Sequence, residues 1–431
     1  MLRLPIENTL DREEKTMAEW VERKISDIGT VVGGATPSTK KPENYEDGKI
    51  AWITPKDLST FSGRYIERGE RNITEIGLKS CSTQLLPPNT ILFSSRAPIG
   101  YVAIAANEVC TNQGFKSVIP NENTDPLFLF YLLKYNKDKI EGMGSGTTFK
   151  EVSGNTMKNI VVNVPTDKKV QEKIAAILGS IDDKIEENEQ INNNLEQQAQ
   201  ALFKSWFVEF EPFNGTMPSD WEIVPLEKIA DFQNGYAFKS KELLNEPSPD
   251  CYQVFKQGHI ARGGGFIPDG TKSWYPKNIA SKLEKFVLKK GDILMAMTDM
   301  KDNVAILGNT AVMPLDNEYI VNQRVGHLRA NGYKGVTYPF IYLLTNSTDF
   351  LVDLRSRANS GVQVNLSSSE IKASQTVLPS EEVNNAFSEI TLPMFEIIIN
   401  NQLENQRLAQ LRDTLLPKLM SGELDVSDIE L

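Results

Sequence analysis

The sequence predicts an α+β protein with two pseudo-symmetric globular domains and two long helices that form an antiparallel coiled coil. Two observations lead to this class: the chain repeats one order of landmarks, and each repeat ends in a heptad pattern. The spacing between matched landmarks drifts slowly, as expected for an old duplication with insertions in surface loops. The matched residues are Trp20 and Trp221, Gly34 and Gly235, Ile91 and Ile293, Asn112-Gln113 and Asn322-Gln323, Ser145 and Ser360, and Pro165 and Pro379.

The pattern divides the chain into four segments. We expect a globular domain over residues 1–169 and a long central helix over 170–212. A second globular domain follows over 213–380, and a C-terminal helix with a short tail over 381–431.

Each globular segment mixes short β-type runs with Gly, Pro, Asn and Asp clusters typical of turns. Helices are indicated where aromatic and aliphatic residues recur at helical spacing. The expected helices are Pro126–Asn136 and Tyr338–Thr345. The expected strands are Ile50–Thr54, Thr90–Ser94, Tyr101–Ala105, Ile160–Val164, Lys285–Leu288, Ile293–Met297 and Ala305–Leu307.

The two helical segments carry matched heptad seams, each with an asparagine at its centre. A polar residue at such a position costs stability but specifies register and orientation. The first seam is Ile174, Ile181, Asn188, Leu195 and Leu202, and the second is Phe387, Met394, Asn401, Leu408 and Leu415.

Antiparallel pairing of the helices would bring the two asparagines within about one turn of each other. Ile174 would then lie near Leu415, and Leu202 near Phe387. The alternative is that each helix packs separately on its own domain. Pro393 interrupts the second seam, so we expect that helix to kink or begin near it.

The net charge of −11 is distributed unevenly. Residues 1–169 and 213–380 each carry +1, whereas residues 170–212 carry −6 and residues 381–431 carry −7. Phosphate would repel the acidic helices, so any basic face for a nucleic acid must lie on the globular segments.

The composition favours a reducing compartment, and we expect a cytoplasmic protein. Three widely spaced cysteines indicate neither a disulfide framework nor a zinc site. No apolar run reaches the roughly 18 residues of a membrane span, and the charged N-terminus lacks the apolar core of a signal peptide.

The residues also predict a chain without catalytic chemistry. The two histidines, His259 and His327, belong to no metal or triad motif and are better explained as structural residues. There is no phosphate-binding loop. Pro87-Pro88-Asn89 has the wrong order for an adenine methyltransferase motif.

Several motifs in the same order resemble those of the specificity subunits of type I restriction–modification systems. The resemblance covers nearly the whole chain and leaves out only about the first 19 residues. The motifs are Gly33–Ser38, Trp52–Leu58, Gly144–Lys150, Leu202–Pro212, Trp221–Leu226 with Phe238–Ser240, and Leu415–Leu424.

This resemblance implies a division of labour. Each target-recognition domain would read one half of a bipartite DNA sequence, and the paired helices would set the spacer and dock the modification subunits. The partners would be double-stranded DNA, two modification subunits and, in some systems, two restriction subunits, in a bacterial or archaeal cytoplasm. S-adenosylmethionine, and ATP and Mg with a restriction subunit, would belong to those partners and not to this chain.

Residue chemistry limits which side chains could touch DNA, because Arg, Lys, Asn and Gln read base edges while Lys, Arg and hydroxyls bind phosphates. For any one candidate, an ordinary surface charge is an equal alternative. In the first domain the candidates are Lys40, Lys41, Lys56, Arg64, Arg96, Lys116, Thr147 and Lys150. In the second they are Lys239, Arg262, Lys272, Lys301, Arg324, Gln363 and Asn365. The recurring Asn-Gln pairs are better explained as buried amides that satisfy the backbone.

Two other functions remain open at this point. An acidic scaffold or DNA mimic would bind the methylating or restricting subunits without binding DNA. An enzyme with its own methyl-transfer site would bind S-adenosylmethionine as an isolated chain.

Overall fold

The computed structural model describes residues 18–146, 150–300, 304–360, 363–427 and 429. The chain forms two compact units. Unit 1 combines Met1–Glu186 with Leu408–Leu431, and unit 2 is Glu187–Arg407. Each unit therefore contains a part of both long helices, α7 (Lys168–Phe207) and α11 (Glu381–Met420).

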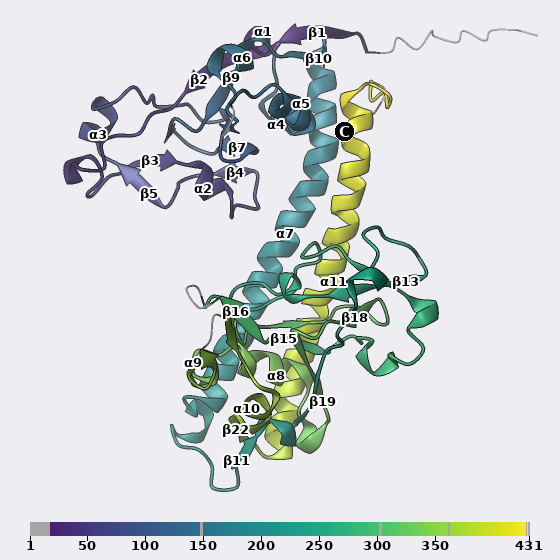
Figure 1. The fold of residues 1–431 in the computed structure, drawn as a ribbon. Helices are drawn as coiled ribbons and strands as arrows, with labels where there is room; N and C mark the ends of the chain where they lie inside the picture. Colours follow the sequence, from purple (N-terminus) through teal and green to yellow (C-terminus); the bar gives the residue numbers. More distant parts are fainter. Residues whose placement is uncertain (1–17, 147–149, 301–303, 361–362, 428, 430–431) are drawn as a thin grey trace, which may run out of the picture. The chain divides into compact units, whose positions relative to one another are not determined.

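Unit 1 is built on a five-stranded sheet (Figure 1). Its strands follow the order β2 (Gly29–Gly33), β9 (Lys116–Pro120), β6 (Ile91–Ser95), β7 (Ile99–Ala105) and β4 (Tyr65–Ile66). A three-stranded sheet has the order β5 (Arg71–Ile73), β3 (Ile50–Ile53) and β8 (Val109–Thr111), and β1 (Trp20–Lys24) pairs with β10 (Val161–Pro165). The helices are α1 (Ile25–Ile28), α2 (Pro55–Leu58), α3 (Glu75–Lys79), α4 (Pro126–Tyr135), α5 (Lys137–Gly142) and α6 (Gly154–Asn159), with a 3-10 turn at Pro42–Asn44.

Unit 2 repeats this plan. A four-stranded sheet has the order β12 (Ala230–Asn234), β19 (Val325–Ala330), β15 (Ile293–Ala296) and β17 (Thr310–Val312). Three-stranded sheets are formed by β14 (Trp274–Pro276), β13 (Cys251–Phe255) and β18 (Tyr319–Val321), and by β16 (Thr298–Met300), β21 (Gln363–Asn365) and β20 (Asn359–Ser360). β11 (Glu222–Pro225) pairs with β22 (Gln375–Leu378), and the helices are α8 (Tyr338–Thr345), α9 (Thr348–Ser356) and α10 (Ser368–Ala373).

The duplication predicted from the landmarks is present at the level of strand pairing. β3 runs parallel to β8 in unit 1, and β13 runs parallel to β18 in unit 2. The antiparallel pairs β1–β10 and β2–β9 correspond to β11–β22 and β12–β19. The α+β class with a duplicated domain is confirmed.

Two of the expected strands are wrong. Residues 284–286 form a 3-10 turn, Val287 makes only an isolated antiparallel bridge with Ile320, and Leu288 is buried outside any strand. Ala305–Leu307 is a turn because the backbone N–H groups of all three residues donate to one carboxylate oxygen of Asp299, at 2.7, 2.7 and 3.2 Å. An apolar run indicates burial but cannot identify such a side-chain acceptor.

The second long helix does not begin at Pro393, because α11 runs through this proline. Proline removes one hydrogen bond from a helix interior. Phe387 and Phe395 are both buried on either side of Pro393. Most of the stability of a helix in a protein comes from packing of its apolar face, and the buried rings of Phe387 and Phe395 supply such packing on both sides of the proline.

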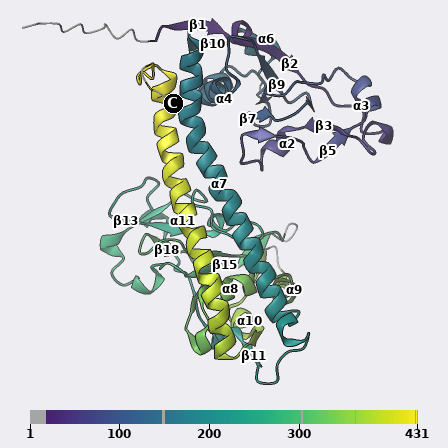
Figure 2. The same cartoon turned by 180° about the vertical axis from the view of Figure 1, so that it is seen from behind.

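The helices pair antiparallel in each unit, and Figures 1 and 2 show them side by side. In unit 2 the amide of Asn188, a residue only 1% exposed, donates to Glu404 Oε2 at 2.7 Å and to Asn405 Oδ1 at 2.9 Å. The Asn401 amide donates to Asn192 Oδ1 at 2.9 Å. The two seam asparagines thus lie about one turn apart, as expected, and the alternative of separately packed helices is excluded.

The remaining seam residues follow the same register. Phe387 packs its ring against Phe203, Trp206 and Phe207, next to the expected Leu202. In unit 1 Ile174 and Leu415 belong to one core, as expected. Ile181 is buried, while Leu195, Leu202, Met394, Asn401, Leu408 and Leu415 are half-buried.

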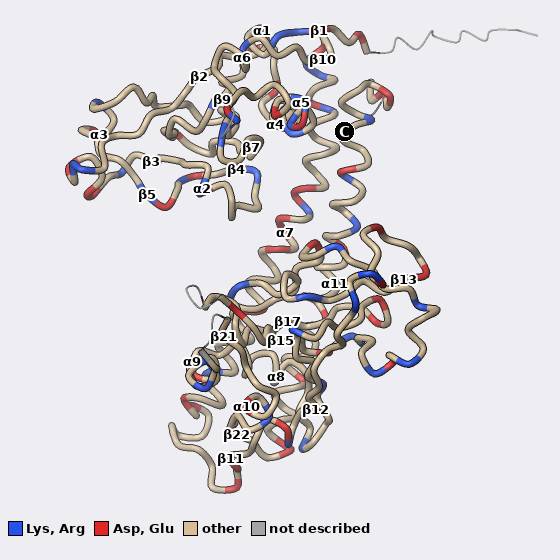
Figure 3. Tube along the Cα trace, viewed as in Figure 1, with Lys and Arg blue, Asp and Glu red and all other residues tan. Residues whose placement is uncertain are grey.

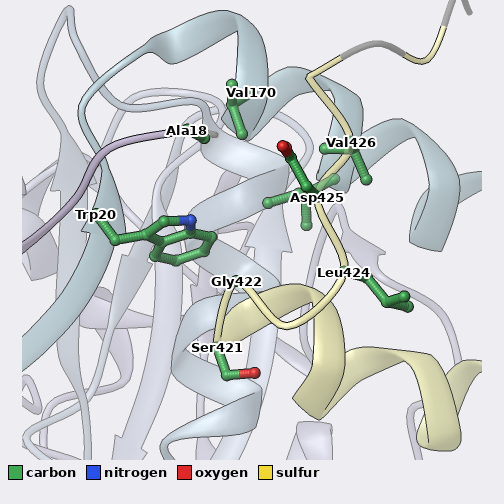
Figure 4. A pocket seen from close by; sticks show the side chains of 9 residues that line it. Ala18, Trp20, Val170, Ser421, Gly422, Leu424, Asp425 and Val426 are labelled. Carbon is green, nitrogen blue, oxygen red and sulfur yellow. The ribbon is translucent and has the colours of Figure 1, made fainter. Parts of the chain in front are cut away.

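The C-terminal tail closes unit 1 (Figure 4). Val426 is buried in the same core as α4, and the Lys173 ammonium donates to the Ser427 carbonyl. The tail turns at Gly422, whose φ is +77°, and a Cβ there would lie 2.7 Å from Trp20 Nε1. A small pocket of about 100 Å³ remains between Trp20, Val170 and the tail.

Replacing Asn188 with Leu should raise the free energy of unfolding by about 1 kcal/mol, because a polar residue at a seam position costs stability relative to an apolar one. The same change should loosen the register that the asparagine specifies and promote self-association. Thermal denaturation and native mass spectrometry measure the two effects. The control is Asn193→Leu on the exposed face of the same helix. A less stable, strictly monomeric Asn188 variant would contradict the seam assignment.

Replacing Gly422 with Ala should destabilise unit 1 because the new methyl group meets Trp20 and the positive φ disfavours an L side chain. Gly215→Ala is the matched control, since its φ is +71° with nothing within 4 Å of the added Cβ. We expect about 1 kcal/mol for the control and at least 1 kcal/mol more for Gly422→Ala. Hydrogen exchange in β1 and the tail reports the loss. Equal effects of the two variants would show that the contact with Trp20 does not hold the tail.

Candidate nucleic-acid interface

One corner of the unit 1 sheet brings several candidate side chains together. We define the first corner as Ser95, Arg96, the turn Asn112–Gly114, Lys116 and Glu151. The turn is closed by the Asn112 side chain, whose Oδ1 accepts from the Gly114 N–H at 2.8 Å, and it is tied to β6 by the Ser95 N–H, which donates to the Gly114 carbonyl at 2.7 Å. Gly34 lies against this turn, where a Cβ would be 2.2 Å from the Thr111 carbonyl oxygen.

The first corner carries charged groups around a single carboxylate. Lys116 Nζ lies 3.4 Å from Glu151 Oε1, and Arg96 Nη1 lies 3.6 Å from Glu151 Oε2. Lys150 is exposed next to them, and the candidate Thr147 lies outside the described residues. Two cations held about one carboxylate leave a net positive charge, which suits a phosphate or a guanine edge.

Unit 2 builds the same corner from different residues. We define the second corner as Met297, Thr298, the turn Asn322–Arg324, and Gln363–Asn365. The Met297 N–H donates to the Arg324 carbonyl at 3.2 Å, matching the bond between Ser95 and Gly114. Gly235 again lies against the turn, where a Cβ would be 2.1 Å from the Asn322 carbonyl oxygen.

The side chains of the second corner are mainly amides. Strand pairing places Thr298 opposite Asn365 and Met300 opposite Gln363. The amide of Gln257 donates to the Thr298 carbonyl at 2.6 Å. Arg324, Gln363 and Asn365 are exposed, although the Asn365 amide also donates to the Gln363 carbonyl at 3.2 Å.

The other candidates lie outside the two corners. Arg64 is buried against helix α7, with its side chain only 6% exposed. Lys56 forms an exposed ion pair with Glu70, and Lys239 pairs with Glu242 at 3.9 Å. Lys301 lies outside the described residues. The remaining exposed candidates in surface loops are Lys40, Lys41, Arg262 and Lys272.

Sequence reasoning misjudged the recurring Asn-Gln pairs and missed two contributors. Gln113 and Gln323 are exposed rather than buried, although Asn112 and Asn322 do accept from backbone N–H groups of their turns. Gln257 and Glu151 were missed because each comes from a distant segment. The recurrence of Asn-Gln in both halves was the available signal.

Both histidines are structural, as predicted. Buried His327 lies 2.9 Å from Asp292, through Nε2 and Oδ2. Burial opposes ionisation of Asp292, but hydrogen bonds from Arg329 and His327 hold the pKa of this carboxyl below its usual value. Burial lowers the pKa of His259, whose Nδ1 lies 3.1 Å from the Lys256 backbone nitrogen. Among the described residues no group of three or more His, Cys, Asp or Glu is placed to hold a metal ion.

Comparisons with known proteins agree with this duplicated arrangement. The model of the type I restriction modification DNA specificity domain matches twice, over residues 17–197 and 218–412. The chain is 34% identical to the specificity subunit of the type I restriction enzyme MjaIX of Methanocaldococcus jannaschii, over 96% of each chain. It is 27% identical to the HindI specificity subunit of Haemophilus influenzae, over 95% of this chain and all of the relative.

A solved structure shows the same fold. The specificity subunit of M. genitalium superposes with a TM-score of 0.59 at 18% identity, covering 96% of this chain and 98% of its own. A fold with two recognition domains and two paired helices defines a class of modular binding subunits. The chain belongs to the family of type I restriction–modification specificity subunits.

Proposed function

We propose that the two corners of this specificity subunit read the two halves of a bipartite DNA target. The observation that carries the proposal is that one corner geometry occurs twice with different side chains. Charged groups dominate the first corner and amides dominate the second, so the half-sites should differ in sequence. Asn and Gln amides match the donor and acceptor pattern of adenine in the major groove.

The partners follow from the family. We propose that two modification subunits dock on the helix pair and supply S-adenosylmethionine, and that restriction subunits, where present, supply the ATP- and Mg-dependent motor. The complex would act in a bacterial or archaeal cytoplasm, where chromosomal DNA lies. Among the described residues, no helix combines the length and apolar character that crossing a bilayer requires.

The charge pattern speaks against the alternative of a DNA mimic. Acidic residues recur along α7 (Figure 3), but many of them bind groups of the same unit. Asp182 accepts from Arg412 at 2.7 Å, and Glu196 accepts from the Tyr342 hydroxyl at 2.6 Å. Carboxylates used in this way do not form a free phosphate-like array.

Replacing Asn365 with Ala should weaken one half-site only. Loss of one bidentate base contact costs about 1–3 kcal/mol, which corresponds to roughly 5- to 150-fold less discrimination at one base pair. Methylome sequencing of a host that carries the chain and its modification subunit measures this at every site. The control is Asn278→Ala, an exposed amide away from the corner.

Three results would contradict the proposal: no bipartite methylated motif with the unaltered chain, equal loss in both half-sites for Asn365→Ala, or S-adenosylmethionine binding by the isolated chain. A partner complex that forms without any DNA binding would favour the scaffold function instead.

A further inference from the structure

Arg64 links the unit 1 sheet to the long helix. Its Nε donates to Glu186 Oε1 at 2.9 Å, and its Nη2 donates to Glu186 Oε2 at 3.1 Å and to Asp183. Its Nη1 donates to the Gly179 carbonyl at 3.3 Å. We call these four residues, Arg64, Gly179, Asp183 and Glu186, the Arg64 clamp.

The spacing on α7 explains how the clamp is built. Gly179, Asp183 and Glu186 stand at i, i+4 and i+7, so they share one face of the helix. A Cβ on Gly179 would lie 3.0 Å from a methyl carbon of Leu127 and 3.5 Å from Arg64 Nη1. The glycine therefore lets the guanidinium reach the helix backbone, at the usual cost of glycine in a helix interior.

The other end of the clamp is part of the sheet. The Arg64 carbonyl accepts from the Ile104 N–H of β7 at 2.7 Å, and the Arg64 N–H donates to Glu186 Oε1 at 3.1 Å. β7 pairs with β6, which ends at Ser95 in the first corner. A rotation of the sheet about α7 would have to break the clamp, so the clamp fixes the direction in which the corner points.

Packing beside the clamp is incomplete. A cavity of about 270 Å³ lies there, lined by Phe61, Tyr101, Phe130 and Lys134 among others. Close-packed side chains at this point would resist a rotation of the sheet about α7, whereas the side chains around a cavity of this size leave room for it. The Arg64 clamp is the hydrogen-bonded restraint at this edge of the sheet, and it acts beside the core that α4 shares with α7 and the bond from the Tyr131 hydroxyl to Asp182 Oδ2 at 2.6 Å.

The chemistry of the Arg64 clamp is better suited to fixing the orientation of the sheet on α7 than to adding stability. Burial alone would lower the pKa of Arg64, but the hydrogen bonds with Glu186 and Asp183 raise it above its usual value, so the group stays charged. A buried ion pair adds little net stability compared with apolar residues of the same size. A planar guanidinium held by several acceptors does define an angle, which a lysine ammonium cannot.

We propose that Arg64 is a positioning residue that sets spacer selectivity: the Arg64 clamp holds the first recognition domain at one angle on α7. This role rests on the proposed function, because it presupposes that the first corner reads a half-site. Without the clamp the domain samples a range of angles, and the protein accepts half-sites at neighbouring spacings with unchanged half-site sequences.

The test uses the complete complex of this chain with its modification subunit. The substrate is a plasmid library in which the spacer between the two half-sites has its native length or is one or two base pairs longer or shorter. With Arg64→Met we expect the ratio of methylation at spacers one base pair off to that at the native spacer to rise at least tenfold. Arg64→Lys should give an intermediate ratio, because an ammonium keeps the charge and loses the fork. Asp183→Asn, which leaves Arg64 in place, should give a smaller rise and keeps the test open if Arg64→Met does not fold.

Ile73→Val is the matched control, since it trims a fully buried side chain of the same domain away from α7. It should lower stability and leave the spacer ratio unchanged. An unchanged ratio with folded Arg64→Met and Arg64→Lys would overturn the positioning role, and so would a changed half-site sequence, which would make Arg64 a base reader. Absence of bipartite methylation by the unaltered chain would instead refute the proposed function.

Discussion

The pairing of α7 with α11 is the constraint on which both units depend. Each unit takes its hydrophobic core partly from both helices, so neither core is complete without them. Apolar seam residues would allow several registers, because one heptad step buries a similar surface. Asn188 donates to two acceptors on the opposite helix, and only a few of those registers place these acceptors within its reach. The polar contacts of Asn188 and Asn401 thus specify the register of a helix pair that the apolar residues stabilise.

The duplication separates what must stay constant from what can vary. The constant part is backbone: a glycine against a turn, an asparagine that closes the turn, and a strand end bonded to it. These contacts need particular φ angles and particular acceptors, which only a few residue types supply. The charged and amide side chains that project from the corners lie outside these turn contacts, so they can differ between the units. Under the proposed function, a charged corner and an amide corner on one backbone plan would read two different half-sites.

Local patterns were sufficient to predict the two long helices, α4, α8 and the seam, since these depend on spacing within one segment, and comparison of the two halves predicted the duplication. The candidate site was less predictable. In the sequence, Arg64 and its neighbours look like an ordinary exposed surface segment. Only the contact of Arg64 with Gly179 on α7 shows that the side chain is buried. The pairing of Thr298–Met300 with Gln363–Asn365 joins segments far apart in the chain, so no local pattern indicates it. The prediction of strands at Lys285–Leu288 and Ala305–Leu307 was wrong for two reasons. The apolar residues of the first segment are buried outside a strand, and the backbone of the second is held by the Asp299 carboxylate.

The central claim is that the helix pair sets the distance between two readers. The most direct measurement lengthens both helices together, by one heptad inserted after Asn193 and one inserted before Asn400, which lie opposite each other in the observed register. Seven residues add about 10.5 Å of helix, or about three base pairs at 3.4 Å each. Methylome sequencing should then show the same two half-sites with a spacer longer by about three base pairs. The original spacer, retained with full methylation, would contradict the account.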